Sequence, residues 1–176
     1  MNNNLKRIIY SALFLAIGVV LPFLTGQIKE IGDSLLPMHI PVLLCGFICG
    51  ANYGFFVGLI LPFLRSLMFG MPPIYPNAVW MALELCTYGF MAGFIFNRFK
   101  EKNLLSIYAS LVIAMLSGRV SWALSKLVLL GIANKPFTFE MLLTGGFIDA
   151  IPGIVLQLVL IPLIVKIYIN YSTHNK

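Results

Sequence analysis

SLLPMHIPVLLCGFICGANYGFFVGLILPFL spans residues 34–64 and contains no charged side chain. A helix crosses the hydrocarbon core of a bilayer in about 20 residues, so this run is too long for a single spanning helix. Two glycines and an asparagine at positions 50–54 interrupt it near the middle. The stretch therefore predicts two consecutive spans, at about 37–51 and 52–69, both short for a bilayer.

The rest of the chain has the same apolar character. Of its 176 residues, 60% are apolar and only 10% are charged, and the mean hydropathy is +0.94. Soluble domains are about 45–50% apolar and roughly 25% charged, so this composition excludes an ordinary soluble domain. Uncharged runs predict four further spans, at about 7–24, 77–97, 104–131 and 141–169. We therefore predict one integral membrane domain over residues 1–176, an all-α bundle of six transmembrane helices.

The N-terminal segment has some features of a signal peptide, because Lys6 and Arg7 precede a long apolar run. That run continues from Ile8 to Ile28 without a small-residue cleavage site. This pattern favours a first helix that is retained in the mature protein.

Basic residues outside the predicted spans are unevenly divided between the two sides of the membrane. One side holds Lys6, Arg7, Arg98, Lys100, Lys102, Lys166 and Lys176, and the other holds Lys29 and Lys135. Because cytoplasmic loops carry the excess of Lys and Arg, both termini are predicted to be cytoplasmic. Anionic lipid headgroups then account for the net charge of +6, and no nucleic-acid partner is needed.

Five charged residues fall inside the predicted spans, where an isolated charge costs about 2.5–3.5 kcal/mol near the bilayer centre. They are Arg65, Glu84, Arg119, Lys126 and Asp149. All except Arg119 lie near the predicted outer ends, whereas a proton relay or a channel would distribute polar groups through the full depth. The cluster therefore predicts a binding pocket that opens outward. A purely structural network, in which the acids and bases join helices, is the alternative.

Helical spacing places aromatic rings beside these charges. Trp80, Glu84 and Tyr88 share one helical stripe, and Arg119, Trp122 and Lys126 share another. Such stripes can hold a small, polar and partly flat ligand between rings and hydrogen-bonding groups. The embedded charges include more bases than acids, which favours a ligand with a carboxylate.

The predicted outer loops add further candidates. His39 and Asn77, at the outer ends of their helices, can contribute ligand contacts. The loop from Thr25 to Leu36 is amphipathic and predicts a lid over the pocket.

The sequence does not predict catalysis. Its histidines are His39 and His174, and no nucleophile with a base accompanies them. It has no Gly-rich phosphate loop, so no cofactor is expected in this chain and ATP-driven work would need a partner. Cys45, Cys49 and Cys86 lie in apolar stretches and are interpreted as core residues rather than metal ligands.

The first predicted helix carries Ala12-Leu13-Phe14-Leu15-Ala16, in which two small residues four apart allow another helix to approach closely. It follows a basic N-terminus, in a small chain that also contains LPMHIPVLLCG at 36–46 and a Gly- and Pro-rich pattern between 46 and 93. This combination resembles the substrate-binding S components of energy-coupling factor (ECF) vitamin transporters, over most of the first 95 residues.

The resemblance implies a subunit in the plasma membrane of a bacterium that captures a scarce water-soluble vitamin outside the cell. Such a subunit associates with a membrane coupling protein, the T component, and with two cytoplasmic ATPases that use the ATP. By position, Ala12 and Ala16 match the motif that meets the coupling protein. The predicted excess of positive charge in the pocket puts pantothenate first among ligands, followed by folate, niacin and a pyridoxine- or pyrimidine-like compound. An ion-coupled secondary carrier of a small organic anion and a structural membrane subunit are the alternative functions.

Overall fold

The computed structural model describes residues 3–25, 34–134, 136 and 138–174, and every regular element in these ranges is helical. The elements are α1 (Asn3–Val20), η1 (Leu21–Thr25), α3 (His39–Cys49), α4 (Ala51–Phe69), η2 (Ile74–Ala78), α5 (Val79–Arg98), α6 (Leu104–Ile132), α7 (Phe139–Leu143), η3 (Thr144–Ile148) and α8 (Ile151–His174). The predicted all-α class is confirmed for this part of the chain. The predicted lid at 25–36 lies largely outside the described residues.

Five of the described helices are long and apolar enough to cross a membrane. They are Asn4–Phe23, Ala51–Phe69, Ile74–Arg98, Leu104–Ile132 and Ile151–Tyr171. The remaining predicted span, 37–51, corresponds to α3, which has 11 residues. At 1.5 Å per residue it is about 16 Å long, roughly half of the hydrocarbon thickness of a bilayer. The count of six spans and the orientation of the termini therefore stay predictions.

The break between α3 and α4 lies at Gly50, as the interruption at 50–54 indicated. Gly50 has φ of 104°, a conformation that favours glycine, and its N–H donates to the Gly46 carbonyl to close α3. Pro37 stands just before α3 and limits the helix at its other end. These two residues explain why α3 is so short.

The last predicted span, 141–169, differs from the structure. It is divided into α7, η3 and α8, with a turn at Asp149 and Ala150 before α8 begins at Ile151. Gly145 and Gly146 weaken the helix within the predicted range, and Pro152 favours a new helix start because it has no N–H to donate. The division brings Gly145 and Asp149 to the end of the bundle.

Glycines allow α4 and α5 to approach with their backbones in contact. A Cβ added at Gly54 would lie 2.5 Å from the Gly89 carbonyl oxygen, and one at Gly58 would lie 2.4 Å from the Leu85 carbonyl oxygen. Any larger residue at these positions would force the two helices apart. This close packing fixes the position of the α5 segment that carries Glu84.

Helix α3 lies at the centre of the bundle. It packs against α1 and α4 on one side and against α5 and α8 on the other, while α6 packs on α5 and α8. Val42, Leu43 and Cys45 of α3 have no exposed surface. Apolar side chains from all of these helices therefore form two cores that share α3.

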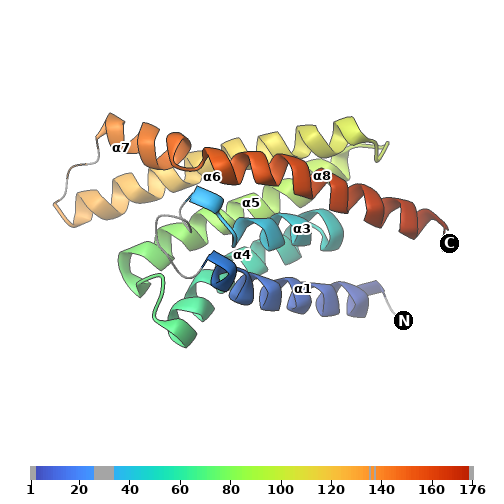
Figure 1. The fold of residues 1–176 in the computed structure, drawn as a ribbon, viewed down its shortest axis with the longest axis horizontal. Coiled ribbons are helices and arrows are strands. Elements are labelled where there is room, and N and C mark those ends of the chain that lie inside the picture. The colour runs from blue at the N-terminus through green and yellow to red at the C-terminus, as the bar shows by residue number, and fades with distance from the viewer. Residues whose placement is uncertain (1–2, 26–33, 135, 137, 175–176) are drawn as a thin grey trace.

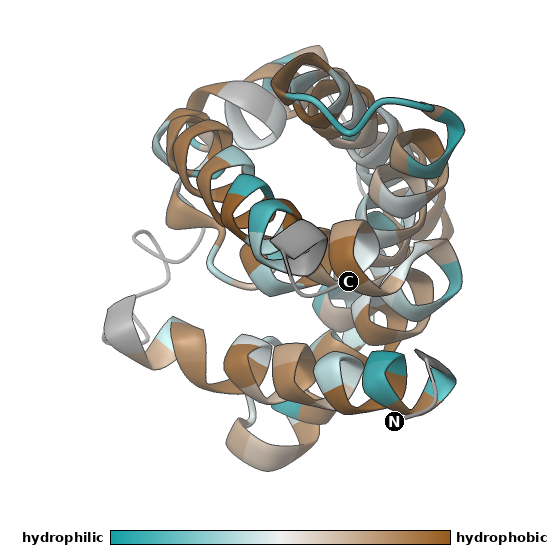
Figure 2. Cartoon of the chain, turned by 90° about the vertical axis from the view of Figure 1, so that its right-hand side faces the viewer, coloured by the Kyte–Doolittle hydropathy of each residue, from teal (hydrophilic) through white to brown (hydrophobic). Residues whose placement is uncertain are grey.

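Both termini lie at the same end of the elongated bundle, and α7 and η2 lie at the opposite end (Figure 1). The helices are largely hydrophobic along their lengths, and hydrophilic residues gather at the end that carries the termini (Figure 2). We call this the basic end, because Lys6, Arg7, Arg98, Lys100 and Lys166 belong to it.

Candidate functional site

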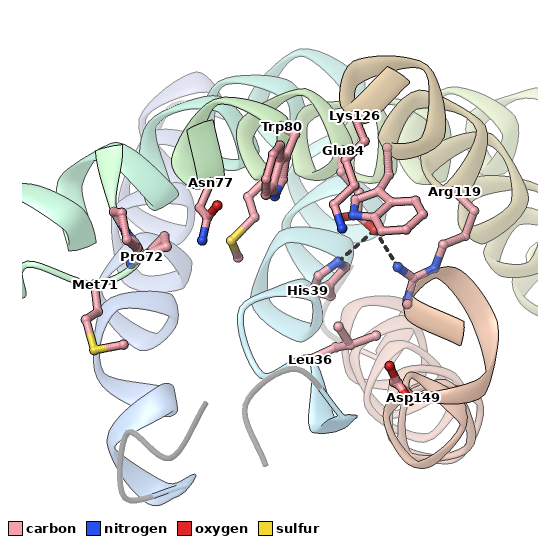
Figure 3. A pocket seen from close by; sticks show the side chains of 14 residues that line it. Leu36, His39, Met71, Pro72, Asn77, Trp80, Glu84, Arg119, Lys126 and Asp149 are labelled. Atoms are coloured by element: carbon pink, nitrogen blue, oxygen red, sulfur yellow. Dashed lines mark hydrogen bonds and ion pairs between the residues drawn. The ribbon is translucent and has the colours of Figure 1, made fainter. Parts of the chain in front are cut away.

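A cavity of about 520 Å³ opens at the end of the bundle opposite the termini. Its volume lies within the 300–1,000 Å³ that small-molecule sites usually have. Side chains from α3, η2, α5, α6 and the segment around η3 converge on it (Figure 3). The lining residues are Leu36, His39, Met71, Pro72, Pro73, Asn77, Trp80, Met81, Glu84, Arg119, Trp122, Lys126, Gly145 and Asp149.

Three buried polar residues from three helices meet at Glu84. The Arg119 Nη1 of α6 donates to the Glu84 Oε1 of α5 at 2.9 Å, and the His39 Nε2 of α3 lies 3.3 Å from the same oxygen (Figure 3). The three residues are only 2–6% exposed. A buried carboxylate needs such partners because its desolvation costs several kcal/mol.

The same cluster keeps unused hydrogen-bonding capacity beside the cavity. Within the described residues, the Nε and Nη2 of Arg119 and the Nδ1 of His39 have no hydrogen-bond partner. Buried polar atoms without hydrogen-bond partners are unfavourable, by about 1–3 kcal/mol each or more for a charged group. A small shift of the guanidinium toward the cavity would therefore let it donate to an acceptor on a bound molecule.

A second group of side chains forms an aromatic wall around a cation. The Nζ of Lys126 lies 5.0 Å from the ring centre of Trp80 and 4.3 Å from that of Trp122. Trp80 comes from α5, whereas Trp122 and Lys126 are one turn apart on α6. The wall thus combines two flat surfaces with a positive charge, each able to contact a flat polar ring.

The rim of the cavity is partly polar and partly apolar. Asn77 of η2 is half-buried and Asp149, just after η3, is exposed. Sequence reasoning missed the apolar and small lining residues Leu36, Met71, Pro72, Pro73, Met81 and Gly145. Such residues are common throughout a membrane protein, so composition gives no signal for them. Pro72, Pro73 and Pro76 precede α5, and such a group of prolines is a sequence signal for a structured loop.

Arg65, one of the ligand candidates, is not among the residues that line this cavity. It is 4% exposed, and its Nη1 donates to the Val19 carbonyl oxygen at 2.8 Å. Its guanidinium also lies over the rings of Phe23 and Phe69, at 5.3 and 5.8 Å. These contacts show that Arg65 joins α4 to the end of α1.

Tyr88 is also absent from the lining, but it contacts His39, which does line the cavity. Its ring packs edge-on against the His39 ring, with centres 5.0 Å apart. A Cβ added at Gly118 would lie 2.3 Å from the Tyr88 ring, so glycine is required for this packing. Tyr88 thereby holds His39 against Glu84.

Ala12 and Ala16 are both exposed on α1, and neither lines the cavity. Ala16 borders a shallow apolar depression with Ile17, Val20 and Leu21. Two small side chains on an exposed apolar helix leave room for another helix to approach.

The described residues contain no group of three or more His, Cys, Asp or Glu side chains that could hold a metal ion. Cys45, Cys49 and Cys86 are free and buried. The cavity lining provides hydrogen-bonding groups, charges and aromatic rings.

Comparison with protein families identifies the chain. A family model described as "ECF transporter, substrate-specific component" matches residues 6–165. The chain belongs to this family. The match confirms the resemblance seen in the first half of the sequence and extends it over the second half. Searches of curated proteins and of solved structures found no match.

Family membership has direct consequences for the role of the chain. ECF substrate-specific components are multi-pass membrane subunits that bind a small-molecule substrate, and they are not enzymes. They work with a T component and ATPases. The protein is therefore a substrate-capture subunit of an ECF transporter.

Proposed function

We propose that the cavity around Glu84 and Arg119 captures a small water-soluble vitamin or vitamin precursor. The single observation that carries this proposal is the convergence of eight sequence-predicted candidates on one cavity of about 520 Å³. They are His39, Asn77, Trp80, Glu84, Arg119, Trp122, Lys126 and Asp149. A purely structural network would use its buried hydrogen-bond donors, whereas Arg119 keeps two buried nitrogens without hydrogen-bond partners in the described structure.

The ligand class follows from the charges and rings of the lining. Without Arg65 the lining holds two bases and two acids, so their charges balance and the excess of positive charge that favoured pantothenate is gone. Glu84 is already neutralised by Arg119 and contacted by His39. The two indole rings flanking Lys126 favour a flat ring with hydrogen-bonding groups. We therefore place folate, niacin and pyridoxine- or pyrimidine-like compounds ahead of pantothenate.

The proposed orientation puts the cavity outside the cell. The basic end carries the termini and the Lys and Arg of the adjoining loop, so the positive-inside rule assigns it to the cytoplasm. The cavity, at the other end, then faces the outside of a bacterial plasma membrane. Ligand captured there would be released on the other side after assembly with the T component and two cytoplasmic ATPases, with Ala12 and Ala16 at the contact.

Reconstitution in vesicles tests this function. The chain alone should bind ligand stoichiometrically without sustained uptake, and addition of the T component, the ATPases and ATP should start uptake. Accumulation driven by an ion gradient in the chain alone would support a secondary carrier instead. Purified chain that binds no compound in a broad vitamin screen would support a structural subunit.

A further inference from the structure

A second hollow lies on the outside of the bundle, between α4 and α5. It has a volume of about 490 Å³ and is lined by Asn52, Phe55, Phe56, Thr87, Phe90 and Met91. The hydroxyl of Thr87 is occupied, because it donates to the Leu83 carbonyl oxygen at 2.7 Å. The groove therefore presents mainly aromatic and apolar surface, and Phe56, one of its lining residues, is 58% exposed. In a membrane protein this face meets lipid.

Stacked rings connect this groove to the basic end of the bundle. The rings of Phe55 and Phe90 meet edge-on with centres 6.4 Å apart, and Phe90 stacks on Phe94 with centres 5.5 Å apart. The guanidinium of Arg98 lies 4.7 Å above the Phe94 ring. Phe94 and Thr87 are seven residues apart on α5, so this surface extends for about 10 Å along the helix at 1.5 Å per residue. A positive charge thus stands at one end of a continuous aromatic surface.

The charges around Arg98 leave it available for an anion. Arg98 and Lys100 are both exposed. Lys102 already donates to the Phe96 carbonyl oxygen, and Glu101, the one acidic residue of this loop, is contacted by the Asn103 amide at 3.5 Å. The end of the groove is therefore positive, as expected for a surface that meets anionic headgroups.

We propose that this groove binds one acidic phospholipid, with the phosphate at Arg98 and Lys100 and an acyl chain along Phe94, Phe90 and Phe55. The two halves of the site match the two halves of such a lipid, a charged head and an apolar chain. A partner helix is a poorer occupant, because interfaces between spanning helices are rich in small residues and this groove is lined by phenylalanines. The groove also uses α4 and α5, whereas Ala12 and Ala16 lie on α1.

Native mass spectrometry of the full chain, released from detergent, tests the proposal. Phosphatidylglycerol should give a one-lipid adduct more readily than phosphatidylcholine with the same acyl chains. Arg98→Gln should lower phosphatidylglycerol binding about fivefold, the effect of one basic side chain at an anionic surface. The matched control Arg7→Gln, an exposed arginine at the same end on α1, should leave it unchanged. Water-soluble glycerophosphoglycerol, which has the head without the chains, should not compete.

The apolar half is tested separately. Phe56→Ala should weaken the adduct, and Ile60→Ala, one turn further along α4 and outside the groove, should not. Equal binding of the two lipids, or equal losses in Arg98→Gln and Arg7→Gln, would overturn the proposal in favour of unspecific annular lipid. Competition by glycerophosphoglycerol would show that the headgroup alone is enough for binding. That result would overturn the role of the groove and indicate a simple anion site.

Discussion

Glu84 and Arg119 form a buried ion pair across α5 and α6, with 2.9 Å between Oε1 and Nη1. The same carboxylate oxygen contacts His39 of α3, so one atom ties together three helices at the floor of the cavity. A ligand that attracts the guanidinium would therefore act on the packing of all three helices.

Arg119→Gln should lower the free energy of unfolding by about 3–5 kcal/mol, because it leaves the Glu84 carboxylate buried without its cation. The double variant Glu84→Gln, Arg119→Gln should recover part of that loss, since neither charge is then left alone. Thermal midpoints in detergent measure both effects. Additive losses in the double variant would show that the two side chains do not interact.

Lys126→Gln should weaken ligand binding while changing the thermal midpoint little, because Lys126 is only half-buried between Trp80 and Trp122. Loss of a charge that contacts the ligand typically costs on the order of 2 kcal/mol or more, which is roughly thirtyfold in Kd. Lys166→Gln, an exposed lysine at the basic end, is the control and should bind normally. Unchanged affinity in Lys126→Gln would place the ligand away from the aromatic wall.

Gly118→Ala should destabilise the protein by about 1–3 kcal/mol, because the new methyl group would overlap the Tyr88 ring. Displaced Tyr88 would also release His39, so affinity should fall as well. Gly131→Ala lies on the same helix in open space and should be neutral or stabilising by up to about 1 kcal/mol. Equal thermal midpoints of Gly118→Ala and Gly131→Ala would contradict the packing of the Tyr88 ring against Gly118.

Ala12→Trp and Ala16→Trp should block assembly with the T component and leave ligand binding intact, because both residues lie on an exposed face away from the cavity. Co-purification with the T component measures assembly. Leu105→Trp, on the exposed surface of α6, introduces the same bulk elsewhere and should assemble normally. Normal transport by the two alanine variants would exclude this face as the contact.

The sequence was sufficient to predict which polar residues of α5 and α6 share the cavity. Trp80 and Glu84 lie one turn apart, as do Trp122 and Lys126, and an uncompensated charge inside a span must face the interior. Both pairs line the same cavity, as does Arg119, whereas Tyr88 lies outside the lining. Periodicity and the cost of burying charge were the physical constraints that made this possible.

The position of Arg65 could not be predicted in the same way. Its depth near the end of a span matched that of the other charges, but depth does not define the direction in which a side chain points. Apart from Asn52 and Ser66, the rest of α4 is largely apolar, so no amphipathic pattern shows which side faces the cavity. The direction depends on the glycine packing of α4 against α5, a tertiary contact that turns Arg65 toward Val19.

The central claim, that the cavity around Glu84 is the ligand site, is tested most directly by a comparison of two buried arginines. Arg119 lines the cavity and Arg65 does not, yet both are at most 6% exposed and both bridge helices. The measurement is the amount of small molecule released from denatured protein, by mass spectrometry, per mole of folded protein isolated from cells. We predict that Arg65→Gln retains the ligand of the unmodified protein and that Arg119→Gln loses at least nine-tenths of it. Equal retention in both variants, or loss in Arg65→Gln alone, would contradict the claim.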